Sequence, residues 1–380
     1  MKPRALAVFA VSLLALALLL DSPRLLRSKQ ERSDREAALS GPEKERTFQF
    51  TYYATVNNLP QQAKRVRIWI PLAVSDTNQK VTVKKVESSV PTRVTREGRY
   101  GNRMLYAEIQ NPKGSSFPFS VEYEVTRRQY SKGSYSSLMR YNTLPPNVPA
   151  GGRRLLQPDR LVPVDGKIRQ IAEENTRGQL GAVEKAHALY EYVFNNLRYD
   201  KSGTGWGRGD SLWACDAKRG NCTDFHSLFI SLARAEHIPA RFEMGFPLPK
   251  STREGSIPGY HCWAEFYVNG AGWVPVDISE AWKDPSKHDY FFGTLDANRI
   301  QFSRGRDLAL APKQDGPPLN YFIYPYVEVD GTPYEKLGKK FTFREERHAT
   351  AGGVESIRLS DDPGARPREN LELASAKKAG

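Results

Sequence analysis

Cysteine, histidine and methionine are scarce in this chain of 380 residues, which contains three cysteines, six histidines and four methionines. Three cysteines are too few for a disulfide-stapled scaffold, and their odd number leaves at least one thiol unpaired. The histidines are scattered along the chain, and no C-x-x-C pair accompanies them. The sequence therefore gives no indication of a structural metal site, and we expect the protein to work without a metal or other cofactor.

A nucleic-acid-binding signature is also missing, although the formal net charge is +13. The basic residues are spread over predicted strands, loops and tails, and no helix rich in arginine and lysine carries interleaved aromatic residues. A solvated basic surface is the simplest interpretation. We expect no nucleic-acid partner, and we keep an anionic polymer of the cell envelope as an alternative partner.

One uncharged, mostly apolar run, Ala5 to Leu20, stands near the N-terminus behind Lys2 and Arg4. As a helix it would span roughly 24 Å, which is short for the ~30 Å hydrocarbon core of a bilayer but long for the apolar part of a signal peptide. We therefore predict that residues 1–20 are a signal peptide or an uncleaved membrane anchor. In both cases we expect the rest of the chain to be exported, either anchored to a membrane or free in the periplasm or outside the cell.

A change of hydrophobic period divides the chain into two folded parts. Apolar and polar residues alternate from Phe48 to Val125, which predicts a β-sandwich. From Asp165 onwards the period becomes helical. The predicted segments are a charged linker (21–46), a β-sandwich domain (47–128), a second linker (129–162), a domain of helices and strands (163–335) and a disordered tail (345–380).

The second folded part begins with helices and continues with strands. Apolar residues follow a helical period from Val183 to Leu197, and a second helix has its apolar stripe from Phe225 to Ala233 and stops before Pro239. A loop rich in glycine and tryptophan separates the two helices. Predicted strands follow in RFEMGFPL, YHCWAEFYV and GWVPVDI. This order of elements places the domain in the α+β class.

Cys222 lies in the first turn of the second predicted helix, within KRGNCTDFHSLF. Unpaired backbone N–H groups and the positive end of the helix dipole stabilise a thiolate at this place. A nucleophilic thiolate also needs a base. His226 shares the helix with Cys222 and points along it, so we interpret it as a partly exposed helical histidine rather than as the base.

His261 is the better candidate for the base. It begins a predicted strand, which the turn Asn269 to Gly272 joins to the strand WVPVD. If the loop has three residues, Val268 pairs with Gly272, and Asp277 becomes the diagonal neighbour of His261 on the same face. A carboxylate there can hold the tautomer and orientation of the imidazole. The alternatives are an unremarkable solvated hairpin or a register that is slipped by one residue.

These motifs carry a resemblance to a known family. GNCTDFHSLFISLARAEHIPARF and HCWAEFYVNGAGWVPVD resemble the core of the transglutaminase-like superfamily, whose papain-like members use a Cys-His-Asp triad. The resemblance covers residues 165–280 and extends more loosely to the preceding β-domain. It implies that Cys222, His261 and Asp277 are catalytic, and that a helix carrying the cysteine packs on an antiparallel sheet. One departure is His237, where family members often have glycine because the position favours a positive φ.

The activity that this resemblance implies is thiol acyl transfer. Cys222 would attack a protein, peptide or amide carbonyl to form a thioester, as in a protease, an amidase or a transglutaminase. Hydrolysis is favoured over crosslinking because water is the default acceptor. The oxyanion would be met by the Cys222 backbone N–H and by a second donor, for which Trp213 is the candidate. The alternative is a catalytically silent module of the same fold that binds a partner in the cell envelope.

Three further residues near these motifs invite structural interpretations. Asp224 follows Cys222 by two positions, and we expect it to pin the start of the helix. Cys215 and Cys262 are either partners in a disulfide or small buried residues, and their spacing does not decide between the two.

Overall fold

The computed structural model describes residues 44–143 and 152–345 of the chain. The predicted leader or anchor at residues 1–20, nearly all of the predicted linker at 21–46 and the predicted tail beyond residue 345 lie outside these ranges. Within the two described ranges, no helix is both long enough and apolar enough to cross a membrane.

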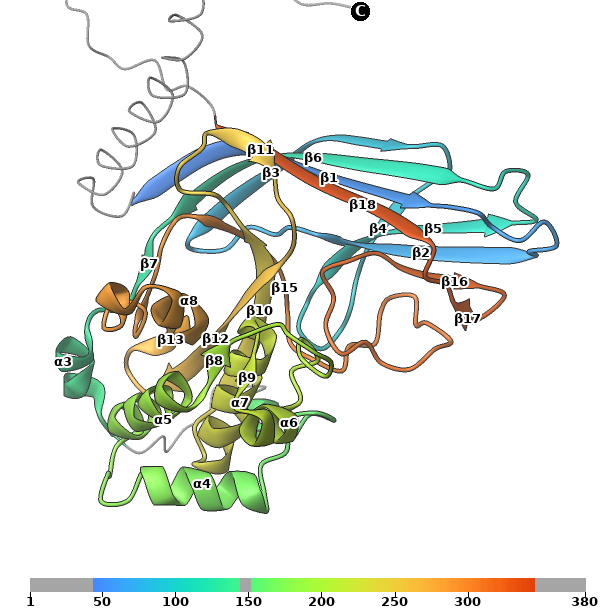
Figure 1. Cartoon of the computed structure of the whole chain (residues 1–380). Coiled ribbons are helices and arrows are strands. Elements are labelled where there is room, and N and C mark those ends of the chain that lie inside the picture. Colours follow the sequence, from blue (N-terminus) through green and yellow to red (C-terminus); the bar gives the residue numbers. More distant parts are fainter. Residues whose placement is uncertain (1–43, 144–151, 346–380) are drawn as a thin grey trace, which may run out of the picture. The chain divides into compact units, whose positions relative to one another are not determined.

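Two five-stranded antiparallel sheets form a β-sandwich (Figure 1). The first sheet contains, in spatial order, β11 (Glu254–Ser256), β18 (Leu337–Glu345), β1 (Glu45–Val56), β6 (Phe117–Arg128) and β3 (Gln79–Ser88). The second contains β17 (Thr332–Pro333), β16 (Tyr326–Val329), β2 (Arg65–Leu72), β5 (Arg103–Gln110) and β4 (Arg93–Arg96). Alternate side chains of the long strands are buried in one core, as the period of two predicted; examples are Phe48 and Phe50 on β1 and Val66 and Ile68 on β2.

The sandwich is not confined to residues 47–128, where the sequence predicted it. β1 pairs with β18 from Phe48 to Val56, and β2 pairs with β16, so strands from far along the chain complete both sheets. β11 adds a short strand from the middle of the predicted second domain. The predicted boundaries at 128 and 335 therefore do not separate two independent sets of strands. A period of two identifies a strand but not its partner, and this is why the sequence assigned too few strands to the sandwich.

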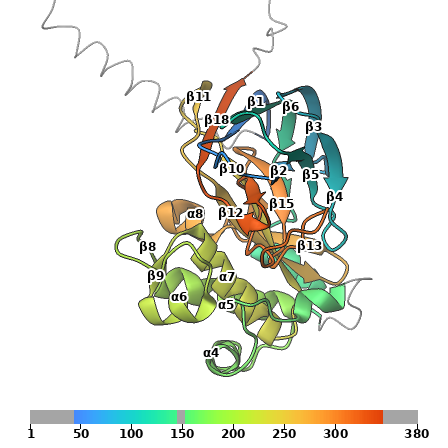
Figure 2. The same ribbon diagram turned by 90° about the vertical axis from the view of Figure 1, so that its right-hand side faces the viewer.

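The second part of the fold has a four-stranded antiparallel sheet covered by helices, which confirms the expected α+β class. The sheet contains, in spatial order, β13 (Gly272–Val276), β12 (His261–Val268), β10 (Ala240–Pro247) and β15 (Arg299–Arg304). The helices are α4 (Lys167–Asn175), α5 (Ala182–Asn196), α6 (Ser211–Ala217), α7 (Cys222–Ala235) and α8 (Ile278–Lys283). α7 packs on β12 and β10, and the other helices pack around α7 (Figure 2).

Short elements connect these larger ones. They are β7 (Tyr130–Ser131), α3 (Tyr135–Leu138), the 3-10 helices η1 (Met139–Tyr141) and η2 (Gly152–Leu156), β8 (Arg198–Tyr199), β9 (Arg219–Gly220), the 3-10 helix η3 (Pro285–Lys287) and β14 (Thr294–Leu295). The segment predicted as a linker at 129–162 contains the first four of them. Because β7 pairs with β14, this segment is tied to the second part of the fold.

Every residue of α7 is buried, including the polar residues His226, Ser227 and Ser231. The sequence predicted a single apolar stripe, but the sheet on one side and the helices on the others leave α7 without a solvent face. The interpretation of His226 as a partly exposed histidine is therefore wrong, since its exposed fraction is 0%. The polar side chains of α7 are accommodated by hydrogen bonds: Ser231 donates to the Pro163 carbonyl, and Ser227 accepts from Arg306.

The end of α7 confirms the unusual backbone that the sequence predicted at His237. The helix ends at Ala235, and His237 has a φ of 60°, in the left-handed region. The next residue, Ile238, donates its N–H back to the carbonyl of Ala233 at 2.9 Å and so satisfies one of the last helical carbonyls.

The sandwich and the second sheet share buried contacts that fix their relation. The Phe50 ring packs on Phe246 and Phe302, with ring centroids 5.4 and 5.6 Å apart. The backbone N–H of Gln301 on β15 donates to the Gln79 side chain on β3 at 2.8 Å, in a buried position. These contacts hold the sheet that carries His261 firmly against the sandwich.

Candidate active site

Cys222 is the first residue of α7, and a capping box fixes this helix start. The Asn221 side chain accepts the backbone N–H of Thr223 at 2.9 Å, and the Asp224 carboxylate accepts the N–H of Asn221 at 2.9 Å. Asp224 also accepts two backbone N–H groups from the glycine-rich loop at residues 203–209, at 2.7 and 2.9 Å. The prediction that Asp224 pins the helix start is confirmed, and the same carboxylate anchors the loop.

The surroundings of Cys222 favour its thiolate. Burial raises the pKa of the thiol, but hydrogen bonds from Cys262 and His261 and the positive charge of His261 together hold it well below its usual range. The N-terminal end of α7 acts in the same direction. Among the described residues, the backbone N–H of Cys222 has no hydrogen-bond acceptor, so it is free to bind a developing oxyanion.

His261 opens β12, Asp277 follows β13, and their side chains meet. Nε2 of His261 lies 2.7 Å from Oδ2 of Asp277, in a buried position. The predicted register is confirmed, because Val268 pairs with Gly272 across a three-residue turn. Since Nε2 faces Asp277, Nδ1 is the ring nitrogen left to interact with the Cys222 thiol, to which His261 is electrostatically coupled. The structure thus brings Cys222, His261 and Asp277 together, with a hydrogen bond between the last two and an electrostatic interaction between the first two.

The imidazole of His261 is held in its charged form. Burial lowers its pKa, but the charge and hydrogen bond of Asp277, together with Cys222, raise it to about 10. With the pKa of the thiol lowered and that of the imidazole raised, the pair exists at neutral pH as a thiolate and an imidazolium. This is the ionic state of a primed thiol nucleophile beside its general acid.

Asp277 uses its two oxygens for different partners. It is the N-cap of α8, where Oδ1 accepts the N–H of Glu280 and the hydroxyl of Ser279, both at 3.2 Å. Oδ2 accepts from His261 and from Nη1 of Arg299, the latter at 2.8 Å. Burial raises the pKa of Asp277, but the charges of His261 and Arg299 outweigh this and hold it well below its usual range. The carboxylate is therefore ionised and fixed in orientation.

Arg299 is a site residue that the sequence did not indicate. It lies on β15, is 2% exposed and bridges Asp277 to Asp296, whose Oδ1 it reaches at 3.2 Å. Its guanidinium also stacks on the Trp263 ring, 5.0 Å from the ring centroid. A buried arginine between two carboxylates fixes both of them, and through Asp277 it fixes the imidazole of His261.

His226 is the second residue whose role the sequence missed. Its Nε2 accepts the backbone N–H of Ile278 at 3.0 Å, so the ring proton must be on Nδ1, which lies 2.8 Å from the Cys222 carbonyl. Burial is the main cause that lowers its pKa, to about 4, and the ring is neutral. His226 therefore ties the first turn of α7 to the residue after Asp277, and it positions the site without supplying the base.

All three cysteines are free and buried, so the disulfide between Cys215 and Cys262 that the sequence left open is not formed. Cys262 lies beside Cys222, and its Sγ is 3.8 Å from the hydroxyl of Thr223 and from Nδ1 of His226. Burial raises the pKa of Cys262 well above its usual range, and the neighbouring Cys222 raises it further. Cys262 is therefore a neutral thiol that can donate a hydrogen bond to the thiolate of Cys222.

Trp213, the candidate for the second oxyanion donor, lies on α6 with its side chain half-buried. Its indole N–H packs against Gly205 in the glycine-rich loop, where a Cβ would stand 2.5 Å from Nε1. None of the contacts found among the described residues joins Trp213 to Cys222. The assignment of Trp213 to the oxyanion therefore stays a prediction.

Tyrosine side chains form one wall beside the helix start. The hydroxyl of Tyr260 lies 2.9 Å from that of Thr223 and accepts from Asn221 Nδ2 at 3.1 Å. The ring of Tyr260 packs against Tyr321 and Tyr324, with centroids 5.7 and 5.9 Å apart. The wall gives the thiol an aromatic, poorly hydrated boundary. In residues 44–143 and 152–345, this site included, no group of three or more His, Cys, Asp or Glu side chains could hold a metal ion.

Comparison with protein families places the site within a matched region. Residues 169–278, which include Cys222, His261 and Asp277, match the family model of the transglutaminase-like superfamily. A protein of Haemophilus influenzae with no assigned function is 27% identical over 311 residues, a match that covers 73% of this chain and 84% of that protein.

Comparison with solved structures supports the same fold. A candidate cysteine protease from Cytophaga hutchinsonii has a TM-score of 0.52 and 17% identity, and the match covers 78% of this chain and 90% of that one. The periplasmic domain of TgpA from Pseudomonas aeruginosa matches with a TM-score of 0.31 and 16% identity, over 67% of this chain and 93% of that one. The first likeness shows a shared fold, and the second is too distant to carry an argument.

Proposed function

Because residues 169–278 of this chain form a transglutaminase-like domain, we propose that the chain is a thiol enzyme that transfers acyl groups from protein, peptide or amide carbonyls through a thioester on Cys222. The observation that carries the proposal is the arrangement of Cys222 at a helix start beside His261, whose imidazole is hydrogen-bonded to Asp277. The thiolate of Cys222 and the imidazolium of His261 are the nucleophile and the general acid that acyl transfer from an amide requires.

The proposed reaction follows from the groups on this chain. The thiolate of Cys222 attacks the carbonyl carbon, a C–S bond forms, and the carbonyl oxygen becomes an oxyanion that the backbone N–H of Cys222 can bind. Nδ1 of His261 then gives its proton to the leaving nitrogen as the C–N bond breaks and the thioester remains. In the second half, the neutral imidazole takes a proton from water or an amine, which attacks the thioester and releases the thiolate.

Hydrolysis is the favoured version of this reaction. Water is present at every surface, and no side chain of the described site is arranged as a dedicated amine site. Asp277 and Arg299 do not take part in bond making; they keep the imidazole in place and ionised while its proton moves. We further propose that the enzyme acts after export, with the apolar run at residues 1–20 as its leader or anchor.

A catalytically silent binding module is the second candidate, and one observation favours it. Cys222 is only 2% exposed, and a thiol that substrate does not reach would be catalytically silent. For the chain to act as an enzyme, a neighbouring segment must move so that a substrate carbonyl can reach the thiol. The glycine-rich loop at residues 203–209 is next to the helix start and is the nearest candidate for such a movement.

Intact mass measurement decides between the two candidates. The full-length wild type and Cys222→Ala are each incubated with a panel of amide and peptide substrates, and the covalent acyl-enzyme is read as an increase in mass. We expect an adduct and substrate turnover in the wild type and neither in the variant. Cys215→Ala serves as the matched control, because it removes a buried thiol outside the site and should leave the adduct unchanged. Equal turnover by wild type and Cys222→Ala would refute the enzyme, and no adduct with any substrate would favour the binding module.

A further inference from the structure

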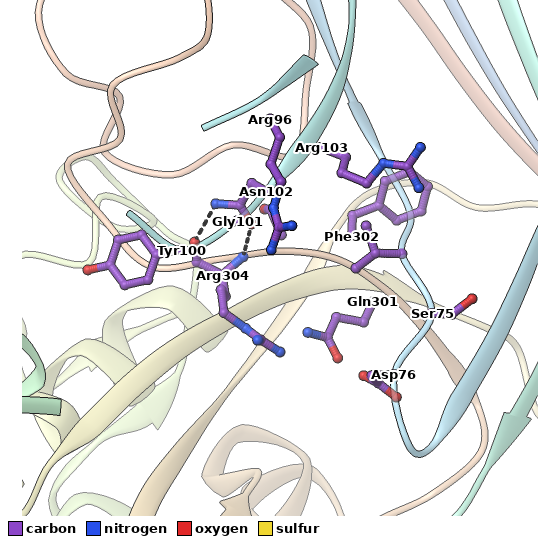
Figure 3. Close-up of a pocket in the computed structure, with 12 residues that line it drawn as sticks. Ser75, Asp76, Arg96, Tyr100, Gly101, Asn102, Arg103, Gln301, Phe302 and Arg304 are labelled. Carbon is purple, nitrogen blue, oxygen red and sulfur yellow. Dashed lines mark hydrogen bonds between the residues drawn. The ribbon is translucent and has the colours of Figure 1, made fainter. Parts of the chain in front are cut away.

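A cavity of about 360 Å³ is lined by residues of the sandwich and of β15, none of which belongs to the thiol site (Figure 3). The hairpin of β4 and β5 supplies Arg96 and Arg103, β15 supplies Arg304, and the loop before β3 supplies Asp76. The proposed acyl transfer uses none of these residues.

Arg96 and Arg103 are directly opposite each other in the antiparallel register of β4 and β5. Side chains in such a pair share a face and have their Cβ atoms about 5 Å apart, and like charges at this position destabilise a sheet. Within the part of the chain that the structure describes, neither guanidinium has an acidic partner or a hydrogen bond. An anion bound between them would remove this repulsion.

Two acidic side chains near the cavity, Glu243 and Asp76, interact with other arginines, and a third, Glu97, accepts backbone N–H groups. Glu243 accepts from Nε of Arg304 at 3.0 Å and pairs with Arg241 at 2.9 Å. Asp76 interacts with Arg127, which is 1% exposed and has Nε and Nη1 without hydrogen-bond partners in the described structure. The positive charges of Arg96 and Arg103 are therefore not balanced by these carboxylates, and the cavity carries an excess of positive charge.

The walls of the cavity are held in place without a ligand. The Glu97 carboxylate accepts the backbone N–H groups of Tyr100 and Asn102, both at 2.9 Å, which fixes the turn of the hairpin. The Asn102 side chain then bridges to β15: it donates to the carbonyl of Arg304 at 2.8 Å and accepts its N–H at 2.9 Å. The guanidinium of Arg96 lies against Gly101, where a Cβ would be 2.6 Å from Nη2. The backbone that carries the two arginines is therefore fixed before a ligand binds, and only their exposed side chains have to be ordered.

We propose that this cavity binds a phosphate group, with the guanidinium groups of Arg96 and Arg103 as its charged donors. A tetrahedral dianion offers enough acceptor oxygens for both planar guanidinium groups, whereas a single carboxylate can pair with only one guanidinium. The cavity is larger than a phosphate ion and leaves room for an organic part, so a phosphate ester fits as well as free phosphate.

Titration calorimetry on the full-length chain tests the proposal, with inorganic phosphate and glycerol 3-phosphate as probes at constant ionic strength. We expect saturable binding of phosphate, roughly tenfold weaker in Arg96→Gln and in Arg103→Gln and roughly a hundredfold weaker in the double variant. Arg93→Gln is the matched control: Arg93 is on β4 but faces the other side, where it stacks on Tyr106, and its loss should not change binding. Tighter binding of glycerol 3-phosphate would identify an ester as the ligand, and equal binding would identify free phosphate.

Two results would overturn the proposal: no saturable binding of either probe by the wild type, or an equal loss of binding in Arg93→Gln and in the double variant. The double variant should melt no lower than the wild type in phosphate-free buffer, because a like-charge pair has been removed. If it melts lower, a second double variant with Arg96→Lys and Arg103→Lys replaces it. This variant keeps both positive charges and removes only the planar guanidinium groups, and it must still bind phosphate more weakly for the proposal to stand.

Discussion

At the scale of single residues, Asp277 serves two structures at once. One oxygen begins α8 and the other holds His261 and Arg299, so the same carboxylate sets the direction of a helix and the charge of an imidazole. Asn221 and Asp224 divide a similar task at the start of α7. In this site the functional side chains are placed by helix starts, where backbone N–H groups need an acceptor in any case.

The ionic state of Cys222 leads to a prediction about its reactivity. The pKa of the thiol is lowered and that of His261 is raised to about 10, so the thiolate–imidazolium pair should persist from below neutral pH up to about pH 10. The rate of iodoacetamide labelling should therefore be nearly flat between pH 6 and 9, unlike that of a free thiol. His261→Ala removes the imidazolium, and we expect labelling at pH 6.5 to fall about 100-fold.

Mass spectrometry of the labelled Cys222 peptide measures this profile. His237→Gly is the control, because it removes an exposed histidine that has no contact with the thiol. A wild-type rate that rises tenfold per pH unit up to pH 8.5 would show an ordinary thiol, and the ion pair would then be absent.

The sequence predicted part of this site for a clear reason. Cys222, His261 and Asp277 stand in local motifs, and a tight turn determines the register that brings the last two together. Arg299 comes from β15, three places away in the sheet from β13, and no local pattern relates it to Asp277. His226 was misjudged because a helical stripe does not reveal what covers the opposite face.

At the scale of elements, α7 is covered on every side and ends in a strained conformation. His237 adopts a φ of 60° while its side chain is exposed, so nothing in its packing compensates for the strain. Glycine takes this conformation without a steric penalty, whereas other residues lose roughly 1 kcal/mol or more. The helix end is therefore a place where a substitution can increase stability.

We expect His237→Gly to raise the free energy of unfolding by about 0.5–1 kcal/mol. Urea denaturation followed by circular dichroism measures the change. The neighbouring Glu236→Gly should have the opposite effect, because Glu236 has a φ of −87° and its carboxylate pairs with Lys185. A loss of stability in His237→Gly would mean that the left-handed residue is held by contacts that its exposure does not suggest.

At the scale of the molecule, strands from the two ends of the described chain pair with each other. β18 lies between β1 and β11, and β16 lies beside β2, so the last described strands belong to the sheets that the first ones began. β18 was not among the predicted strands, and no local pattern indicated that the sandwich needs it. Sheet partners separated by most of the chain leave no local signal.

Truncation tests this dependence. A chain that ends at residue 335 lacks β18 and exposes the edge of β1 over nine residues of pairing, Phe48 to Val56. We expect this variant to aggregate or to be cut rapidly by protease, whereas a chain that ends at residue 346 should melt as the full-length protein does. Size-exclusion chromatography and thermal melting measure both. Native-like melting of the shorter chain would show that β1, β3 and β6 form a stable sheet alone.

The pairing of the first strand with the last also bears on how the protein is made. Arg46 on β1 binds Glu345 on β18, 299 positions later. At a translation rate of about 5–20 residues per second, one edge of β1 waits roughly 15–60 s for its partner to leave the ribosome. During that time the nascent chain is kept unfinished, with an open hydrogen-bonding edge that a chaperone can recognise.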